Sequence, residues 1–231
     1  MHRFIALFTL SVFALACGDR RAGTHPRTSA AVVSDSDVRR LPPERKATVP
    51  DVMLSAADRG RMLGADSARV QMYIISDLQC AACKRWHTDV WPSIRATYVD
   101  QGLVRVIFVH YPLRDHASAV LAASAAQCAS AQGQFWPAIN KLFETQLLWA
   151  SVSAPTVLLD SLAAVPGVDV TTLHNCTASH RVFRQIRADI NWTDNAKLGE
   201  PPMILVGTRR LSGTSPLTTI RAAVDSALAG K

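Results

Sequence analysis

The 231-residue chain contains 48% hydrophobic and 19% charged residues, which suits one globular domain with a substantial core and excludes disorder of the whole chain. Its formal net charge is +7 at pH 7, with 25 Lys and Arg against 18 Asp and Glu. Residues 1–50 carry eight of the basic and four of the acidic residues, which leaves 17 against 14 in the rest of the chain. No basic run stands out in that remainder, so we expect no nucleic-acid partner.

Residues 1–16 have the composition of a secretory signal peptide. Arg3 gives a positive start, and residues 4–15 are apolar except for Thr9 and Ser11. This stretch is too short to span a membrane permanently, whereas a basic start, an apolar centre and small residues at a cleavage point are typical of an export signal. We therefore predict export to the periplasm or another part of a bacterial cell envelope.

Cleavage after Ala16 places Cys17 at the new amino terminus. A cysteine there resembles the lipid-acceptor cysteine of bacterial lipoproteins, although Ala14 replaces the leucine that those proteins prefer. We expect lipidation of Cys17, which would anchor the protein to a membrane surface; the alternative is ordinary cleavage that leaves Cys17 unmodified. Residues 17–50 mix Arg, Ser, Thr, Asp and Pro without an apolar period and are predicted to form a flexible tether.

Residues 51–231 are predicted to form the folded domain. Its first part, near residues 52–66, has a weak amphipathic pattern made by Leu54, Ala57, Met62 and Leu63. Residues 70–76 are rich in β-forming side chains and predict a buried strand.

Two cysteines, Cys80 and Cys83, follow this strand and precede a segment in which Trp86, Val90 and Ile94 recur at helical spacing. The pair therefore lies where a strand passes into a helix. Unpaired N–H groups and the dipole at a helix amino terminus favour a thiolate at Cys80, and Cys83 is close enough to form a disulfide with it. A reactive thiolate and a resolving thiol are the minimum requirement for thiol–disulfide exchange.

Zinc binding and a passive disulfide are the alternatives for this pair. Cys80, Cys83 and His87 could supply three zinc ligands, but no second Cys-x-x-Cys or close His/Cys pair supplies a fourth. Lys84 stands where covalent haem attachment requires histidine. A passive disulfide would close a very small ring and constrain the unfolded chain little. Redox exchange is the favoured interpretation, and we expect no metal and no organic cofactor.

The segment from Ile75 to Cys83 resembles the active-site signature of the DsbA-like thioredoxin family. Further motifs follow in the family's order: His110-Tyr-Pro-Leu113, His116 with Ala119, Ala122-Ala-Ser-Ala-Ala-Gln-Cys128-Ala, Gln132-Gly-Gln-Phe-Trp136, Leu142-Phe143 and Gly199-Glu-Pro201-Pro-Met-Ile-Leu-Val-Gly207. Each motif is short, but their shared order makes the resemblance specific over about residues 66–228. It implies an α/β thioredoxin fold with an inserted helical subdomain at about residues 117–183.

The residue pattern outside the motifs agrees with that fold. Strands are predicted at 103–109 and 203–206, helical segments at 117–149 and 157–198, and a final amphipathic helix at 217–229. Phe135 and Trp136 are expected in the core of the insertion.

The resemblance also implies a cis-proline loop that faces the disulfide and receives the substrate chain. Pro201 matches the cis position by its distance from Gly207, although the residues alone would equally allow the two consecutive prolines to end a helix. Ile74 stands where relatives often keep a buried, proton-shuttling acid, and Glu200 precedes Pro201 where Thr or Val is usual. We expect the Glu200 carboxylate to raise the pKa of Cys80 and make a weaker oxidant, or else to accept the proton that an acid at position 74 would have handled.

Cys128 and Cys176 fall in helical segments of the insertion. An isolated helical cysteine is commonly a buried small apolar residue, but the remaining cysteines of an exported protein tend to pair. Some relatives carry a second, non-catalytic disulfide between the same motifs. We therefore expect a Cys128–Cys176 disulfide, which resolves the odd count of five cysteines into one processing site and two pairs.

Three histidines near these motifs invite catalytic interpretations. His116 follows a Pro-Leu turn and is predicted to begin a helix, and His87 lies one turn beyond Cys83. We expect His87, His110 and His116 to be structural or solvated, with only His87 near enough to influence the thiols.

Together these features predict an exported thiol–disulfide oxidoreductase in which Cys80 is the nucleophile, Cys83 the resolving thiol and Pro201 part of the substrate groove. Its expected partners are cysteine-containing exported proteins, a membrane redox partner and a membrane surface. The sequence leaves the direction of exchange open. The alternative is a DsbA-like binding or scaffold lipoprotein with a vestigial cysteine pair.

Overall fold

The computed structural model describes residues 51–230. The predicted signal peptide, the tether and Cys17 lie outside these residues. In chain order the elements are α2 (Asp51–Gly60), β1 (Met62–Leu63), β2 (Val70–Ser76), α3 (Ala81–Arg85), a π-helical segment (Trp86–Val90), α4 (Trp91–Ile94), a second π-helical segment (Arg95–Val99), β3 (Val104–His110), α5 (Ala119–Ser130), α6 (Phe135–Glu144), α7 (Gln146–Trp149), α8 (Thr156–Ala163), α9 (Val170–Ser179), α10 (Phe183–Asn195), β4 (Met203–Val206), β5 (Arg209–Ser212) and α11 (Leu217–Leu228).

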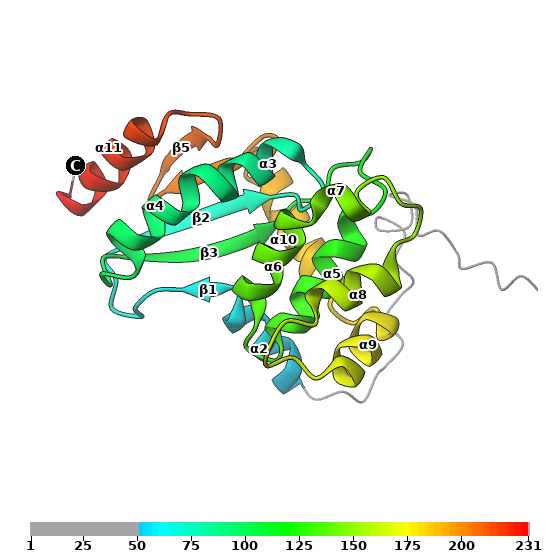
Figure 1. The fold of residues 1–231 in the computed structure, drawn as a ribbon. Helices are drawn as coiled ribbons and strands as arrows, with labels where there is room; N and C mark the ends of the chain where they lie inside the picture. The colour runs from blue at the N-terminus through cyan, green and yellow to red at the C-terminus, as the bar shows by residue number, and fades with distance from the viewer. Residues whose placement is uncertain (1–50, 231) are drawn as a thin grey trace, which may run out of the picture. The chain divides into compact units, whose positions relative to one another are not determined.

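A mixed five-stranded sheet organises the described residues, with the strand order β1-β3-β2-β4-β5 (Figure 1). Strands β2 and β3 are parallel, in a register that sets Val70 opposite Val104 and Ser76 opposite His110. The other strands join by antiparallel pairing. Because β2 and β3 are parallel, they end at the same edge of the sheet, and the loops that follow them start side by side. The fold is the predicted α/β thioredoxin fold with helices inserted between β3 and β4.

The sequence predicts strands β2, β3 and β4 but not β1 or β5. The strands at 70–76 and 203–206 are confirmed, and the one at 103–109 is observed one residue later. The sequence assigns Met62 and Leu63 only to a weak amphipathic pattern; in the structure α2 ends at Gly60 and these two residues form β1, which pairs with β3. Strand β5 has no apolar alternation, since three of its four residues are exposed. Strands β1 and β5 therefore depend on pairing with a neighbouring strand rather than on an apolar pattern of their own.

Strand β2 carries the chain into the interior. It is paired on both sides, with β3 and β4. Along its first half buried and more exposed residues alternate, as expected for a strand with two different faces. Its last three residues, 74–76, are all buried, so the loop that follows begins inside the protein.

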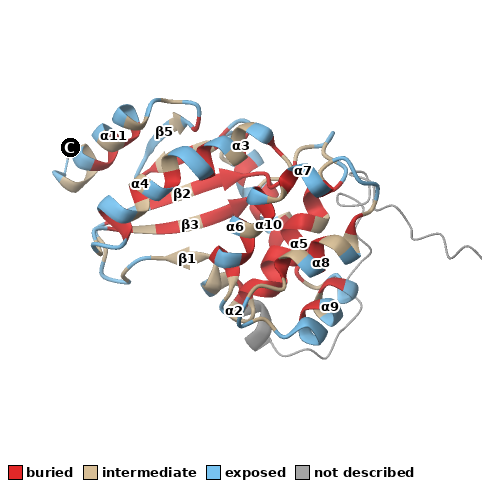
Figure 2. Ribbon diagram, in the orientation of Figure 1, coloured by how far each residue is buried: buried red, intermediate tan, exposed pale blue. Residues whose placement is uncertain are grey.

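Helix α5 is the central helix of the insertion and is buried nearly all round (Figure 2). It is rich in alanine, and α2, α6, α8 and α9 all pack against it. Small side chains allow the neighbouring helices to approach closely on every side. A helix this uniformly apolar shows no amphipathic stripe because it has no solvent face. Within residues 51–230 no helix combines the length and the apolar composition needed to cross a membrane.

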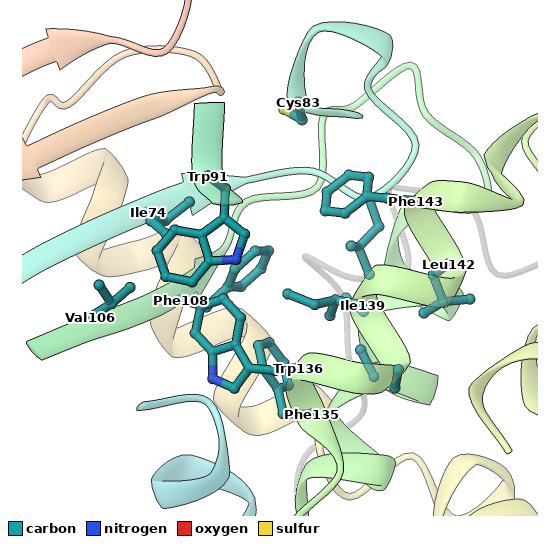
Figure 3. Packing of buried hydrophobic residues seen from close by; sticks show 14 of the residues in the cluster. Ile74, Cys83, Trp91, Val106, Phe108, Phe135, Trp136, Ile139, Leu142 and Phe143 are labelled. Atoms are coloured by element: carbon teal, nitrogen blue, oxygen red, sulfur yellow. The ribbon is translucent and has the colours of Figure 1, made fainter. Parts of the chain in front are cut away.

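An aromatic cluster joins the insertion to the sheet and to the helix that follows the cysteines. Trp91 of α4 stacks on Trp136 of α6, with 4.9 Å between the ring centroids. Phe108 of β3 meets the edge of Phe135 at 5.2 Å. Figure 3 shows these residues together, with Ile139 beside them and Cys83 above. The predicted burial of Phe135 and Trp136 is confirmed, and both also contact residues outside the insertion.

The predicted disulfide between Cys128 and Cys176 is confirmed. It joins α5 to α9, with 5.8 Å between the Cα atoms and a sequence separation of 48. The bond therefore closes a long loop that contains α6, α7 and α8.

Removing this disulfide should lower the stability of the protein. In the chain-entropy model a loop of about 50 residues contributes about 4 kcal/mol, so we expect the Cys128→Ala/Cys176→Ala variant to lose up to about that much free energy of unfolding in a urea titration. The matched control is Cys80→Ala/Cys83→Ala, which removes a pair that could close only a very short ring and should cost far less through this mechanism. Equal losses in the two variants would contradict the assignment.

Candidate active site

Cys80 occupies the N-cap position of helix α3. Strand β2 ends at Ser76, a turn follows in which the Cys80 N–H donates to the Asp77 carbonyl at 3.2 Å, and the helix begins at Ala81. The Cys80 Sγ accepts a hydrogen bond from the Cys83 N–H at 3.3 Å. It thereby satisfies one of the N–H groups that a helix start leaves without a helical partner. The predicted strand-to-helix placement of the pair is confirmed.

The two cysteines occupy different environments although they are one turn apart. Both are free thiols, with Cys80 7% exposed and Cys83 1% exposed. The hydrogen bond from the Cys83 thiol and the N–H groups of Cys83 and Ala82 lower the pKa of Cys80 to about 6, against the opposing effects of burial and the Asp77 charge. Burial, followed by interaction with Cys80, raises the pKa of Cys83. At neutral pH Cys80 is therefore mainly a thiolate, whereas the more deeply buried Cys83 is a thiol.

Asp77 is a buried carboxylate beside this pair that the sequence analysis did not single out. Its Oδ1 accepts from the Gln79 N–H at 2.6 Å, and its Oδ2 accepts from the Leu113 N–H at 2.7 Å. The same Oδ2 lies 2.7 Å from Nδ1 of His116. The sequence feature that could have identified Asp77 is its position, three residues before the first cysteine and immediately after a predicted buried strand.

Two glutamines fasten the cysteine loop to the inserted helices. The Gln146 side chain, in α7, donates to the carbonyls of Leu78 at 2.7 Å and Cys80 at 3.1 Å. The Gln79 side chain donates to the Ala150 carbonyl at 2.6 Å and accepts from the Ser118 N–H at 2.8 Å. These contacts hold the site rigidly against the insertion. No sequence motif marks them, because the partners are backbone groups far away in the chain.

The histidines differ from their predicted roles in one important respect. His87 is buried, its Nε2 lies 2.7 Å from the Asn140 Oδ1, and burial lowers its pKa to about 4. His110 is also buried, and burial lowers its pKa to about 3. Both therefore serve as neutral, structural residues. The expectation that only His87 could influence the thiols is wrong, since it is His116 that interacts electrostatically with Cys80.

His116 lies in a turn ahead of α5 rather than at the start of that helix. Its N–H donates to the Leu113 carbonyl at 3.2 Å, and its carbonyl accepts from the Ala119 N–H at 3.0 Å.

Across residues 51–230 no group of three His, Cys, Asp or Glu side chains is arranged to hold a metal ion.

The predicted cis-proline is displaced by one residue. The cis peptide bond joins Pro201 to Pro202, so the cis residue is Pro202 and the prediction of Pro201 is wrong. The peptide bond before either proline can adopt the cis form, and the distance from Gly207 along the sequence could not decide between them. Pro202 packs against Gly213, whose N–H donates to the Pro202 carbonyl at 2.7 Å and where a β-carbon would clash.

The sheet register places this proline loop near the end of β2. Ile75 pairs with Met203 in the antiparallel ladder, so Pro202, one residue earlier, lies level with Ser76 at the edge from which the cysteine loop leaves. Glu200 is exposed and does not adjoin the cis-proline, because Pro201 stands between them. The premise of the Glu200 prediction is thus corrected: the carboxylate that opposes the Cys80 thiolate is Asp77.

Comparison with known proteins agrees with this geometry. The sequence model of a family described as thioredoxin matches residues 56–226. The chain is 25% identical over 175 residues to disulfide bond formation protein D of Bacillus subtilis, covering 74% of this chain and 78% of that protein. It is also 29% identical over 201 residues to the Na(+)/H(+) antiporter NhaA 1 of Salinispora arenicola, covering 83% of this chain and 29% of the antiporter. The chain thus spans less than a third of that relative's length.

Solved structures share the fold. The oxidised form of BdbD from Bacillus subtilis superposes with a TM-score of 0.68 at 24% identity, covering 74% of this chain and 95% of that one. Alpha-DsbA1 of Wolbachia pipientis superposes with a TM-score of 0.65 at 20% identity, covering 84% and 96%. With a family match over most of the chain and cysteines at the expected strand-to-helix junction, the protein belongs to the thioredoxin family and has a DsbA-like thioredoxin fold.

Proposed function

We propose that the protein is a thiol–disulfide oxidoreductase with Cys80 as the nucleophile and Cys83 as the resolving thiol. The observation that carries the proposal is the unequal pair: a thiol at a helix N-cap whose pKa is lowered to about 6, one turn before a buried thiol whose pKa is raised. Exchange needs such a division, because the thiolate is the attacking form and the resolving thiol must stay protonated until its turn.

The steps follow from the two positions. The Cys80 thiolate attacks one sulfur of a substrate disulfide, which forms a mixed disulfide and releases the other substrate sulfur as a thiolate. Cys83 then gives up its proton and attacks the Cys80 Sγ, which forms the Cys80–Cys83 disulfide and releases the second substrate sulfur. Two electrons pass to the substrate; the reverse sequence takes two electrons from a substrate dithiol.

The lowered pKa of Cys80 favours the oxidising direction. A cysteine of low pKa is stabilised in the reduced form and is a good leaving group from a disulfide, so a protein that contains it tends to donate its disulfide. The relatives named as disulfide bond formation proteins fit the same direction.

The surface beside the cysteines suits cysteine-containing, incompletely folded proteins as substrates. Leu147 and Leu148 of α7 are 82% and 62% exposed. They directly follow Gln146, whose side chain donates a hydrogen bond to the Cys80 carbonyl. In this proposal the two adjacent leucines bind apolar segments of the substrate chain. In this proposal the proline loop at Pro201 and Pro202 forms part of the substrate groove.

The proposed setting is the cell envelope, with a membrane redox partner that recycles the cysteine pair. The Cys128–Cys176 disulfide supports an oxidising compartment, and the composition of residues 1–16 supports export.

Loss of the nucleophile should abolish exchange. We expect Cys80→Ser to reduce the rate of insulin disulfide reduction by at least about a hundredfold, since a hydroxyl cannot replace the attacking thiolate. Cys83→Ser should instead accumulate a mixed disulfide with the substrate, detectable on a non-reducing gel. Equal activity of the wild type and Cys80→Ser would contradict the enzyme proposal and favour the alternative of a binding or scaffold protein.

Reactivity of Cys80 should follow its lowered pKa. Alkylation of the reduced protein by iodoacetamide depends on the thiolate, so with a pKa of about 6 the rate at pH 5 should be about a tenth of its plateau. Cys83→Ala removes the hydrogen bond that contributes most to this effect and should move the profile to higher pH. Peptide mapping identifies the modified residue, and a midpoint near 8.5, the ordinary value for cysteine, would contradict the prediction.

Lipidation of Cys17 can be tested by intact mass. We expect the protein isolated from membranes of an expressing bacterium to carry a diacylglycerol and an acyl chain on Cys17, and Cys17→Ala to appear in the soluble fraction. An unmodified amino terminus at Cys17 in the wild type would refute the anchor while leaving the redox proposal unaffected.

A further inference from the structure

The loops after β2 and β3 are joined by several hydrogen bonds, one of which pairs the side chains of Asp77 and His116. The side chain of Asp77 has no exposed surface, and its Oδ2 lies 2.7 Å from Nδ1 of His116. The other two hydrogen bonds to this carboxylate come from the backbone N–H groups of Gln79 and Leu113. His116 is therefore the one side chain among these donors, and the one that can bring a full positive charge to the carboxylate.

The carboxylate is positioned to oppose the nucleophile. The Asp77 carbonyl accepts the Cys80 N–H at 3.2 Å, so Asp77 begins the turn that carries the cysteine. A negative charge near a thiol disfavours the thiolate, and the charge of Asp77 accordingly raises the pKa of Cys80. The low pKa of Cys80 is thus achieved despite a buried like charge.

Three negatively charged groups raise the pKa of His116. The hydrogen bond to Asp77 raises the pKa of His116 most, burial opposes it, and the charges of Asp77, Asp115 and Cys80 raise it further. Asp77 comes from the loop after β2, Asp115 is its chain neighbour, and Cys80 caps α3. Electrostatic coupling is mutual, so an imidazolium that is favoured by the Cys80 thiolate favours that thiolate in return.

We propose that His116 is a positioning residue for Cys80 that acts by charge: its imidazolium neutralises the buried Asp77 carboxylate and thereby permits the thiolate. This inference rests on the proposed function, in which Cys80 is the nucleophile, and it identifies a residue that sets the reactivity of that nucleophile. Loss of the His116 charge exposes Cys80 to an uncompensated carboxylate and makes it less acidic.

Two substitutions at His116 separate charge from hydrogen bonding. His116→Gln keeps an N–H donor for Asp77 and removes the charge, whereas His116→Lys keeps both a donor and a charge. The matched control is His174→Gln, because His174 forms a similar pair with Asp160 at 3.1 Å on α9 and α8. The Cys80 pKa is measured from thiolate absorbance at 240 nm and by peptide-mapped alkylation.

We expect His116→Gln to raise the Cys80 pKa by about half a unit or more, less than a direct ion pair would give. The alkylation rate at pH 5 should then fall about threefold for that shift. His116→Lys and His174→Gln should keep the wild-type value. An unchanged pKa in a folded His116→Gln variant overturns the inference, and so does an equal rise in the Gln and Lys variants, because charge would then not be the cause.

A reciprocal measurement avoids any change at His116. NMR titration of the imidazole in the reduced wild type and in Cys80→Ser should show a lower His116 pKa in the variant, where no thiolate supports the imidazolium; identical values overturn the inference. Neither titration requires turnover. A shift in Cys80 pKa in a protein that fails to reduce insulin would refute only the proposed function, whereas an active wild type without the shift refutes only the role of His116.

Discussion

The junction between β2 and α3 is the constraint on which the site depends. A buried strand carries the chain into the interior, and a helix begins after four intervening residues, so the first cysteine caps a free N–H group while the second enters the core. Two cysteines one helical turn apart thus have pKa values that are shifted in opposite directions. The hydrogen bond from the Cys83 thiol and helix capping lower the pKa of Cys80, burial raises the pKa of Cys83, and the charges of nearby groups then adjust the pair.

The inserted helices do more than cover the sheet. Gln146 of α7 binds the backbone of the cysteine loop directly, and Trp136 of α6 stacks on Trp91 of the helix that follows the cysteines. The Cys128–Cys176 disulfide crosslinks two helices of the same insertion. A site held from both sides keeps the geometry of Cys80 fixed, which a thiolate that relies on a few aligned N–H groups requires.

The residues that sequence reasoning missed are those whose partners lie far away in the chain. Asp77 and His116 are 39 positions apart and meet because two parallel strands end at one edge of the sheet. His87 has the spacing of a residue beside the thiols, yet it is buried against Asn140 and Phe143. The proline loop was correctly located to within one residue, but two adjacent prolines have the same local chemistry, and contact with Gly213 distinguishes Pro202 only in the folded chain.

The sequence by itself determined strands β2, β3 and β4, the position of the cysteine pair at a helix start, the family and the second disulfide. These depend on local periodicity, on motif order and on cysteine count, which are properties of the chain as written. Only the tertiary structure decided which carboxylate acts on the pKa of Cys80, which histidine pairs with that carboxylate and which proline is cis. Those outcomes depend on strand register and on the packing of separate loops, and neither is encoded in the spacing of neighbouring residues.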